Sequence, residues 1–223
     1  MKRLLLILLI PITFIGTAQT DRKYSVEITG NFGVAWLTSF EKIDNALAAR
    51  NFPAFERNMK VIQKGGGVLT FRINKWGVML GSGSSILETK ADANRYFYNG
   101  TIENEFVGVS YDLLSHKWFT FSPYVTFGYQ ENKTYLDYKF EDGVVPVSLK
   151  IEGKESNVTL GGKFYFRFAK WSEERWQLFF NADVHYTHSF EGTWRLDNER
   201  INPKDFNLSQ IGTLAGVSLR YRL

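Results

Sequence analysis

The chain has 223 residues, of which 44% are hydrophobic, 16% aromatic and 22% charged, and it contains no cysteine. This composition is too apolar for a disordered chain, and the lack of cysteine excludes a disulfide scaffold, a cysteine-ligated zinc site and a cysteine nucleophile. The sequence has no run of about 20 unbroken apolar residues, which excludes a bundle of transmembrane helices.

The first segment has the three parts of a secretory signal peptide. Met1-Lys2-Arg3 is basic, residues 4–15 are mostly apolar, and Gly16-Thr17-Ala18 offers small residues for cleavage. We therefore predict a signal peptide over residues 1–18 and a mature domain over residues 19–223. Cleavage would lower the formal net charge from +4 to +2, because Lys2 and Arg3 would be lost. Nucleic-acid binding then has no support from composition.

The rest of the chain repeats one pattern, in which apolar and polar residues alternate. Alternation of this kind predicts β-strands with one apolar face. We predict eight strands, and an even number is typical of an up-and-down barrel. They are expected near residues 24–36, 69–73, 76–80, 107–113, 119–129, 158–168, 176–186 and 211–223.

The predicted connections are short and long in turn. Three are short, at residues 74–75, 114–117 and 169–175. The others are long, at about residues 38–63, 85–98, 131–155 and 190–207. Short turns at one end and long loops at the other predict a barrel whose two ends face different environments.

The size of the side chains indicates which face points outward. An eight-stranded barrel has an interior just wide enough for its own side chains. The apolar faces carry many large rings, such as Phe121, Phe166 and Trp176, which would overfill that interior. We therefore expect the apolar faces to contact lipid, and a soluble lipocalin-like binder is the less favoured alternative. Charged residues of the opposite faces should form a polar network in the lumen: Glu27, Arg72, Lys163, Arg167, Asp183, His185 and Arg220.

Two long loops contain apolar patterns of their own. Phe40, Ile43 and Leu47 have the spacing of one helix face, which predicts a helical lid over the barrel mouth. The third long loop contains Asp142-Gly143 between alternating runs, which predicts a protruding hairpin. A change of apolar parity on both arms predicts a pair of β-bulges. Phe40, Ile43 and Leu47, in the first long loop (loop one), either pack on the barrel mouth or form a surface for a partner or lipid. The hairpin residues expected to contact the lid are Leu136, Tyr138, Phe140, Val145 and Val147.

The end of the chain carries a further pattern. Val217, Leu219, Tyr221 and Leu223 alternate up to the last residue. In this the chain resembles small bacterial outer-membrane barrels of the OmpA/OmpX type, as a barrel without a periplasmic domain. The resemblance implies that these residues form the signal read by the barrel-assembly machinery. Members of that group usually end in phenylalanine, whereas this chain ends in leucine.

Together these features predict an all-β fold. It is an eight-stranded antiparallel up-and-down transmembrane β-barrel with a helical extracellular loop and a protruding hairpin. The expected location is the bacterial outer membrane. Its expected partners are outer-membrane lipid, the assembly machinery and an extracellular partner at loops one and three. No cofactor or metal site is expected.

The predicted function is a structural or surface-interaction role without catalysis. One alternative is a lipid-modifying enzyme, since His185-Tyr186-Thr187 is similar in spacing to the His-x-Ser motif of lipid A deacylases. Another is a narrow conduit for small hydrophobic molecules, which would need an apolar upper lumen and a lateral opening. An open diffusion pore is disfavoured, because aqueous channels need roughly 16 strands.

Overall fold

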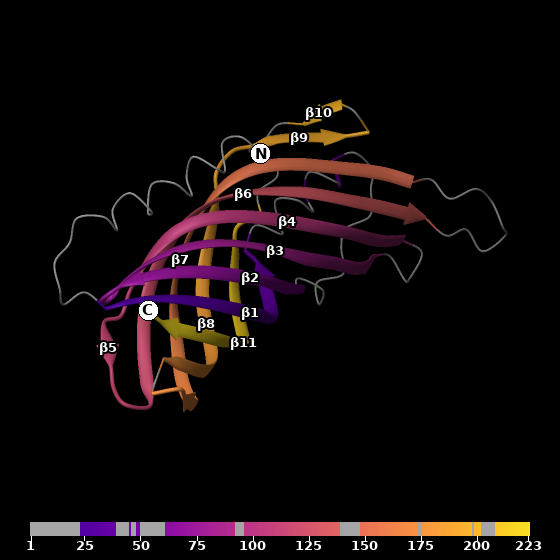
Figure 1. Cartoon of the computed structure of the whole chain (residues 1–223). Coiled ribbons are helices and arrows are strands. Elements are labelled where there is room, and N and C mark those ends of the chain that lie inside the picture. The colour runs from indigo at the N-terminus through magenta and orange to yellow at the C-terminus, as the bar shows by residue number, and fades with distance from the viewer. Residues whose placement is uncertain are drawn as a thin grey trace.

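The computed structural model describes residues 23–38, 45, 48–49, 61–91, 96–138, 148–173, 175–197, 199–201 and 208–223. Eight long strands dominate this part of the chain, together with the short strands β5 (Leu114–Ser115), β9 (Thr193–Leu196) and β10 (Glu199–Ile201) (Figure 1). The long strands are β1 (Tyr24–Leu37), β2 (Val61–Ile73), β3 (Trp76–Ala91), β4 (Tyr96–Tyr111), β6 (Phe119–Tyr138), β7 (Ser148–Trp171), β8 (Trp176–Ser189) and β11 (Gln210–Arg222).

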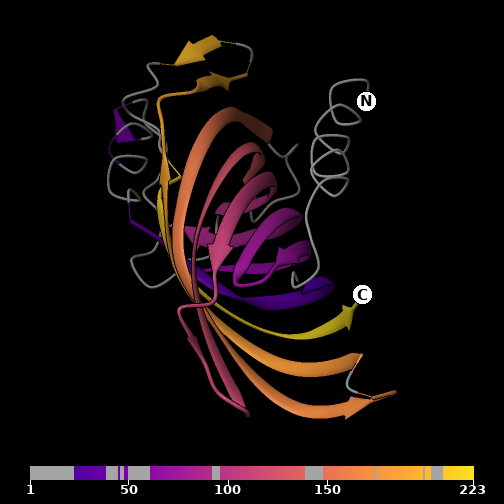
Figure 2. The same ribbon diagram turned by 60° about the vertical axis from the view of Figure 1, so that its left-hand side comes forward.

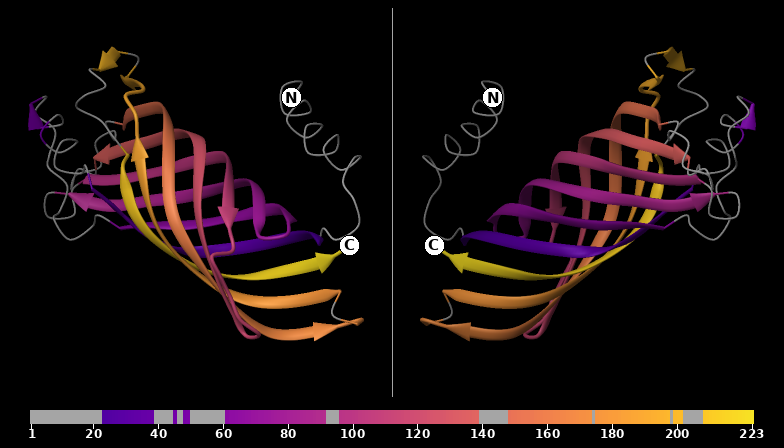
Figure 3. Two further views of the ribbon diagram at one scale, coloured as in Figure 1. Left: turned by 90° about the vertical axis from the view of Figure 1, so that its left-hand side faces the viewer. Right: turned by 90° about the vertical axis from the view of Figure 1, so that its right-hand side faces the viewer.

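The eight long strands close into a barrel. Each pairs antiparallel with its neighbour in the sequence, and the last strand, β11, pairs with the first, β1. Figures 2 and 3 show the yellow β11 lying between the indigo β1 and the orange β8. Every long strand therefore has two hydrogen-bonded neighbours, and the sheet has no open edge among them. This confirms the predicted eight-stranded up-and-down barrel.

The barrel is polar inside and apolar outside. On β1, the inward Glu27 and Thr29 are 0% and 1% exposed, whereas the outward Ile28 and Phe32 are 63% and 69% exposed. Successive side chains of a strand point to opposite faces, so the alternation in the sequence becomes a separation between lumen and exterior. Soluble proteins rarely expose large apolar side chains over a whole surface. A surrounding lipid bilayer explains why they cover the outside of this barrel.

One end of the barrel carries tight turns. Asn74 between β2 and β3 has φ of 54°, and Ser172 and Glu173 between β7 and β8 have φ of 51° and 57°. These left-handed conformations let adjacent antiparallel strands connect within a few residues. The predicted loop at residues 85–98 is shorter than expected, because β3 and β4 extend into it. In the described residues, no helix has the length and apolar character to cross a membrane.

Strands β6 and β7 continue beyond the apolar belt as the predicted hairpin. We call residues 130–138, 148–155 and 193–201 the extension. The register between β6 and β7 is continuous from Phe119↔Phe166 to Asp137↔Ser148. The predicted pair of bulges is therefore wrong. Parity changes because Ile151, which points inward and is 3% exposed, packs inside the extension, whereas lower apolar residues point outward.

The extension also contains a small hairpin that the alternation pattern did not predict. Strand β9 pairs with β7 from Ile151↔Leu196 to Lys154↔Thr193, and β10 pairs with β9. Asp197, with φ of 46°, lies in the turn between β9 and β10. The hairpin lies at the opposite end of the barrel from β5 (Figure 1). Residues 190–207, predicted as a loop, thus contribute two strands.

Candidate functional site in the barrel lumen

A buried ionic network fills the lumen near the end with the tight turns. Glu27 of β1 is fully buried and accepts hydrogen bonds from three side chains on three other strands. Arg72 Nε lies 3.3 Å and Arg220 Nε 2.9 Å from Oε2, and the Tyr165 hydroxyl lies 2.7 Å from Oε1. We call this the Glu27 network. An isolated buried carboxylate would be very costly, so two arginines and a phenol are needed to stabilise it.

Arg72 extends this network to the neighbouring wall of the barrel. Its Nη1 donates to Asp112 Oδ1 at 2.7 Å, and Ser122 also donates to that oxygen. Its Nη2 donates to the Tyr165 hydroxyl at 3.0 Å. One guanidinium thus joins β2 to the chain segment after β4 and to β7. The planar fork of five N–H donors explains why arginine can serve three acceptors at once.

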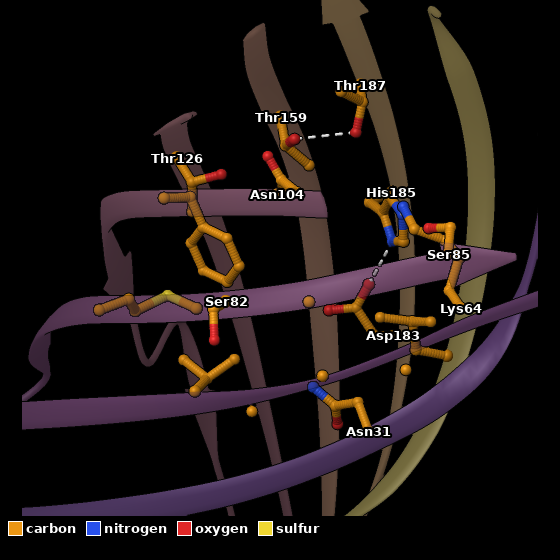
Figure 4. Close-up of a pocket in the computed structure, with 18 of the residues that line it drawn as sticks. Asn31, Lys64, Ser82, Ser85, Asn104, Thr126, Thr159, Asp183, His185 and Thr187 are labelled. Atoms are coloured by element: carbon orange, nitrogen blue, oxygen red, sulfur yellow. Dashed lines mark hydrogen bonds and ion pairs between the residues drawn. The ribbon is translucent and has the colours of Figure 1, made fainter. Parts of the chain in front are cut away.

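A second polar cluster lies higher in the lumen. Asp183 Oδ1 accepts from the Tyr124 hydroxyl at 3.0 Å and lies 2.7 Å from His185 Nδ1. His185 Nε2 lies 3.4 Å from Lys64 Nζ. Lysine can only donate, so Nε2 accepts and the proton of a neutral imidazole sits on Nδ1, facing Asp183. Figure 4 shows His185, Asp183 and Lys64 around one open space.

Within the described residues, His185 contacts Lys64 and Asp183 and no hydroxyl nucleophile. The Thr187 hydroxyl hydrogen-bonds with the Thr159 hydroxyl at 2.8 Å rather than with His185. A catalytic base must lie within hydrogen-bonding reach of its nucleophile. His185 also points into the lumen, where it is 5% exposed, so it faces away from the apolar outer surface. Among the described residues, no group of three or more His, Cys, Asp or Glu could hold a metal ion.

A third cluster joins the extension to the barrel. Glu155 accepts from Trp194 Nε1 at 2.9 Å, from Gln130 Nε2 at 2.9 Å and from the Leu208 backbone N–H at 3.3 Å. Burial raises the pKa of Glu155, and the hydrogen bonds from Gln130, Trp194 and Leu208 oppose that shift. One carboxylate thus connects β6, β7, β9 and the segment before β11.

The seven predicted lumen residues fall into separate groups. Glu27, Arg72 and Arg220 meet in the Glu27 network, and Asp183 and His185 meet in the upper cluster. Lys163 is 2% exposed and is the register partner of Asp183. Arg167 does not join them: it is partly exposed and donates to the Lys117 carbonyl at the turn end.

In the Glu27 network and the upper cluster, four residues were missed from the sequence: Lys64, Asp112, Tyr124 and Tyr165. Glu155, Gln130 and Trp194 of the third cluster were missed as well. Strand parity could have revealed Tyr165, since it alternates with Phe164 and Phe166 and shares the parity of Lys163. The same signal was available for Asp112, because it lies within the predicted strand 107–113 and shares the parity of the buried Ser110.

Of the predicted loop and terminal residues, only some can be placed. Phe40, Ile43, Leu47, Phe140, Val145 and Val147 lie outside the described residues. Leu136 and Tyr138 lie on β6, but their side chains are not described. In loop one, Asn45 and Ala48 are helical, and the Ala49 N–H donates to the Asn45 carbonyl; this single turn does not support the predicted helical lid. Four residues of β11 and the terminus lie on the outward face: Val217, Leu219, Tyr221 and Leu223.

A closed barrel of this kind, with a polar filled lumen and an apolar exterior, is the fold of small outer-membrane barrels. A major outer membrane protein from Thermus thermophilus is similar at a TM-score of 0.54 and 14% identity, over 92% of this chain and 100% of that one. Neisserial surface protein A aligns at 0.45 and 10%, over 92% and 100% of the two chains. OprG of Pseudomonas aeruginosa aligns at 0.43 and 13%, over 93% and 99%. A scan against protein families finds no match, and neither does a search of curated proteins.

Proposed function

We propose that the protein is an outer-membrane barrel with a structural or surface-interaction role and without catalytic activity. The observation that carries this proposal is the combination of an apolar exterior with a lumen crossed by the Glu27 network. The exterior fits outer-membrane lipid as its partner, with the extension on the cell surface. The outward residues of the terminal strand fit recognition by the barrel-assembly machinery, after a signal peptide over residues 1–18 is removed.

The alternatives are less well supported by the lumen. A conduit for small hydrophobic molecules would need an apolar upper lumen, but that region carries Lys64, Asp183 and His185. A lipid-modifying enzyme would need His185 at the outer surface and a nucleophile beside it. Surface interaction is favoured by the extension, because β10 pairs only with β9 within the described residues and offers an edge to a partner strand. The apolar residues of loops one and three are the proposed extracellular contact.

The experiment is fractionation of the producing cell followed by gel electrophoresis of boiled and unboiled samples. We expect the protein in the outer-membrane fraction, with heat-dependent mobility. Planar-bilayer recordings should show no stable open pore, because Glu27 and its partners occupy the lumen. A periplasmic location without heat-dependent mobility would overturn the membrane assignment, and steady conductance would overturn the closed lumen.

A further inference from the structure

A cavity lies in the lumen above the Glu27 network. Its volume is about 90 Å³, and it is lined by residues of all eight long strands, including the bare backbone of Gly66 and Gly83. Figure 4 shows Asn31, Lys64 and Asn104 around this space. A cavity of this size holds several water molecules or one small solute, since a water needs roughly 10–15 Å³ on this measure.

Lys163 reaches this cavity as a buried ammonium without a hydrogen-bond acceptor among the described residues. Its side chain is 2% exposed and lines the cavity. Within the described chain, its ammonium lies over the ring of Tyr165, 5.8 Å from the ring centre. Asp183 and Glu27 attract its charge without a hydrogen bond to it, and both are engaged by other groups, Asp183 by Tyr124 and His185, and Glu27 by two arginines and Tyr165. A buried cation in this state favours an anionic partner.

Lys64 is a second cation that lines the same cavity. It is partly exposed, and the hydrogen-bond partner of its ammonium in the described residues is the His185 ring rather than a carboxylate. Around the cavity and the Glu27 network, four described cations, Lys64, Arg72, Lys163 and Arg220, face three described carboxylates, Glu27, Asp112 and Asp183. The buried carboxylate Glu155 belongs to the separate cluster near the extension.

We propose that this cavity binds one small carboxylate anion between Lys163 and Lys64. The two ammonium groups would supply charge-assisted hydrogen bonds, and the polar side chains of Asn31, Asn104 and Thr126 would complete the site. Because Lys163 is 2% exposed whereas Lys64 is partly exposed, we expect the anion to enter past Lys64. The volume limits the ligand to the size of acetate or a similarly small acid. This site goes beyond the structural role proposed above.

The test uses the full barrel refolded in detergent micelles, with ¹³C-labelled lysine and sodium acetate as the probe. Sodium gluconate keeps the ionic strength constant, because gluconate is too large for the cavity. We expect acetate to cause saturable shifts of two lysine ε-CH₂ signals. One of these signals should be absent in Lys163→Met and the other in Lys64→Met, which assigns them, while the signal of the outward Lys154 should not move.

The variants then measure the affinity of the site. Lys163→Met should weaken acetate binding at least tenfold, and Lys64→Met should weaken it less. Lys154→Met, on the same strand but 58% exposed outside, is the matched control and should bind like the wild type. Heat-dependent gel mobility checks that each variant folds. If Lys163→Met does not fold, the titrations of the wild type and of Lys64→Met still show whether the cavity binds acetate. Shifts of all lysines in proportion to acetate, or no saturable shift in the wild type, would refute the site.

Discussion

Strand β7 belongs to two regions that are built in opposite ways. In the barrel, its outward Leu160 and Phe166 are 56% and 46% exposed, while the inward Lys163 is 2% exposed. In the extension, the inward Ile151 is 3% exposed, while the side chain of the outward Lys154 is 58% exposed. The register of β6 and β7 runs through both regions without a break. The backbone pairing is therefore the same in both regions. Only the side chains differ: apolar residues face outward in the barrel and inward in the extension.

The difference teaches that the medium outside the sheet selects the side chains, rather than the geometry of the strand. Where lipid surrounds the barrel, apolar side chains face outward and polar groups must be satisfied in the lumen. Where water surrounds the extension, charged residues face outward, and the buried Leu196 and Trp194 of β9 lie beside Ile151 and Gly153 inside. The change of apolar parity along the sequence thus marks the point where the strand leaves the membrane.

The largest expected effect comes from removing the central charge of the barrel. Glu27→Ala would leave Arg72 and Arg220 facing each other without their shared carboxylate. Removing one partner of a buried ion pair costs about 3–5 kcal/mol, so the free energy of unfolding should fall by that amount. Urea unfolding in micelles, followed by tryptophan fluorescence, measures it. Glu152→Ala, which removes a partly exposed surface ion pair with Lys150, is the control, with an expected change below about 1 kcal/mol. Equal losses in both variants would contradict the role of the Glu27 network.

The second prediction places the same charge on the outside of each region. Leu160→Arg puts a guanidinium into the apolar belt and should cost about 2–4 kcal/mol near the middle of the membrane. Tyr135→Arg is the matched change in the extension, because Tyr135 also points outward and is 42% exposed, compared with 56% for Leu160. It should change the free energy of unfolding by less than about 0.5 kcal/mol, because the site faces water. Unfolding from lipid vesicles compares the two, and similar costs would show that the regions share one medium.

The sequence predicts the barrel well because alternation is a local property of each strand. Ile28 and Phe32 indicate the outward face of β1, and this prediction needs no information about the neighbouring strands. The site was harder to predict, because contacts such as Arg72–Asp112 and Lys64–His185 depend on the stagger of strands distant in the chain. The change of apolar parity between the barrel and the extension is visible in the sequence, but it was interpreted as a pair of bulges. No single residue marks the boundary of the membrane. The β9–β10 hairpin was missed because its strands are short.

A smaller effect is expected from the contact between Gly153 and Trp194. A Cβ added at Gly153 would lie 2.5 Å from the indole ring, so Gly153→Ala must displace Trp194 from the extension. Overpacking of this kind costs about 1–3 kcal/mol. Here the cost should fall on the extension alone. Hydrogen exchange of the β9 amides should therefore become faster while global unfolding is unchanged. Gly30→Ala, on the lipid side of β1 with nothing within 4 Å of the new Cβ, should leave both unchanged.

The smallest effect concerns pH and the Glu155 cluster. Burial raises the pKa of Glu155 in the folded extension above its value in the unfolded chain. The folded state therefore binds the proton more tightly, and the free energy of docking should decrease as pH rises from the unfolded pKa through the raised folded pKa. Glu155→Gln cannot titrate, so its docking free energy should lack this decrease. Hydrogen exchange of β9, corrected for the intrinsic pH dependence and compared with Glu152→Gln, measures the slope. A persistent slope in Glu155→Gln would assign it to another group, whereas its loss would identify Glu155 as the acid that couples the water-exposed extension to the barrel.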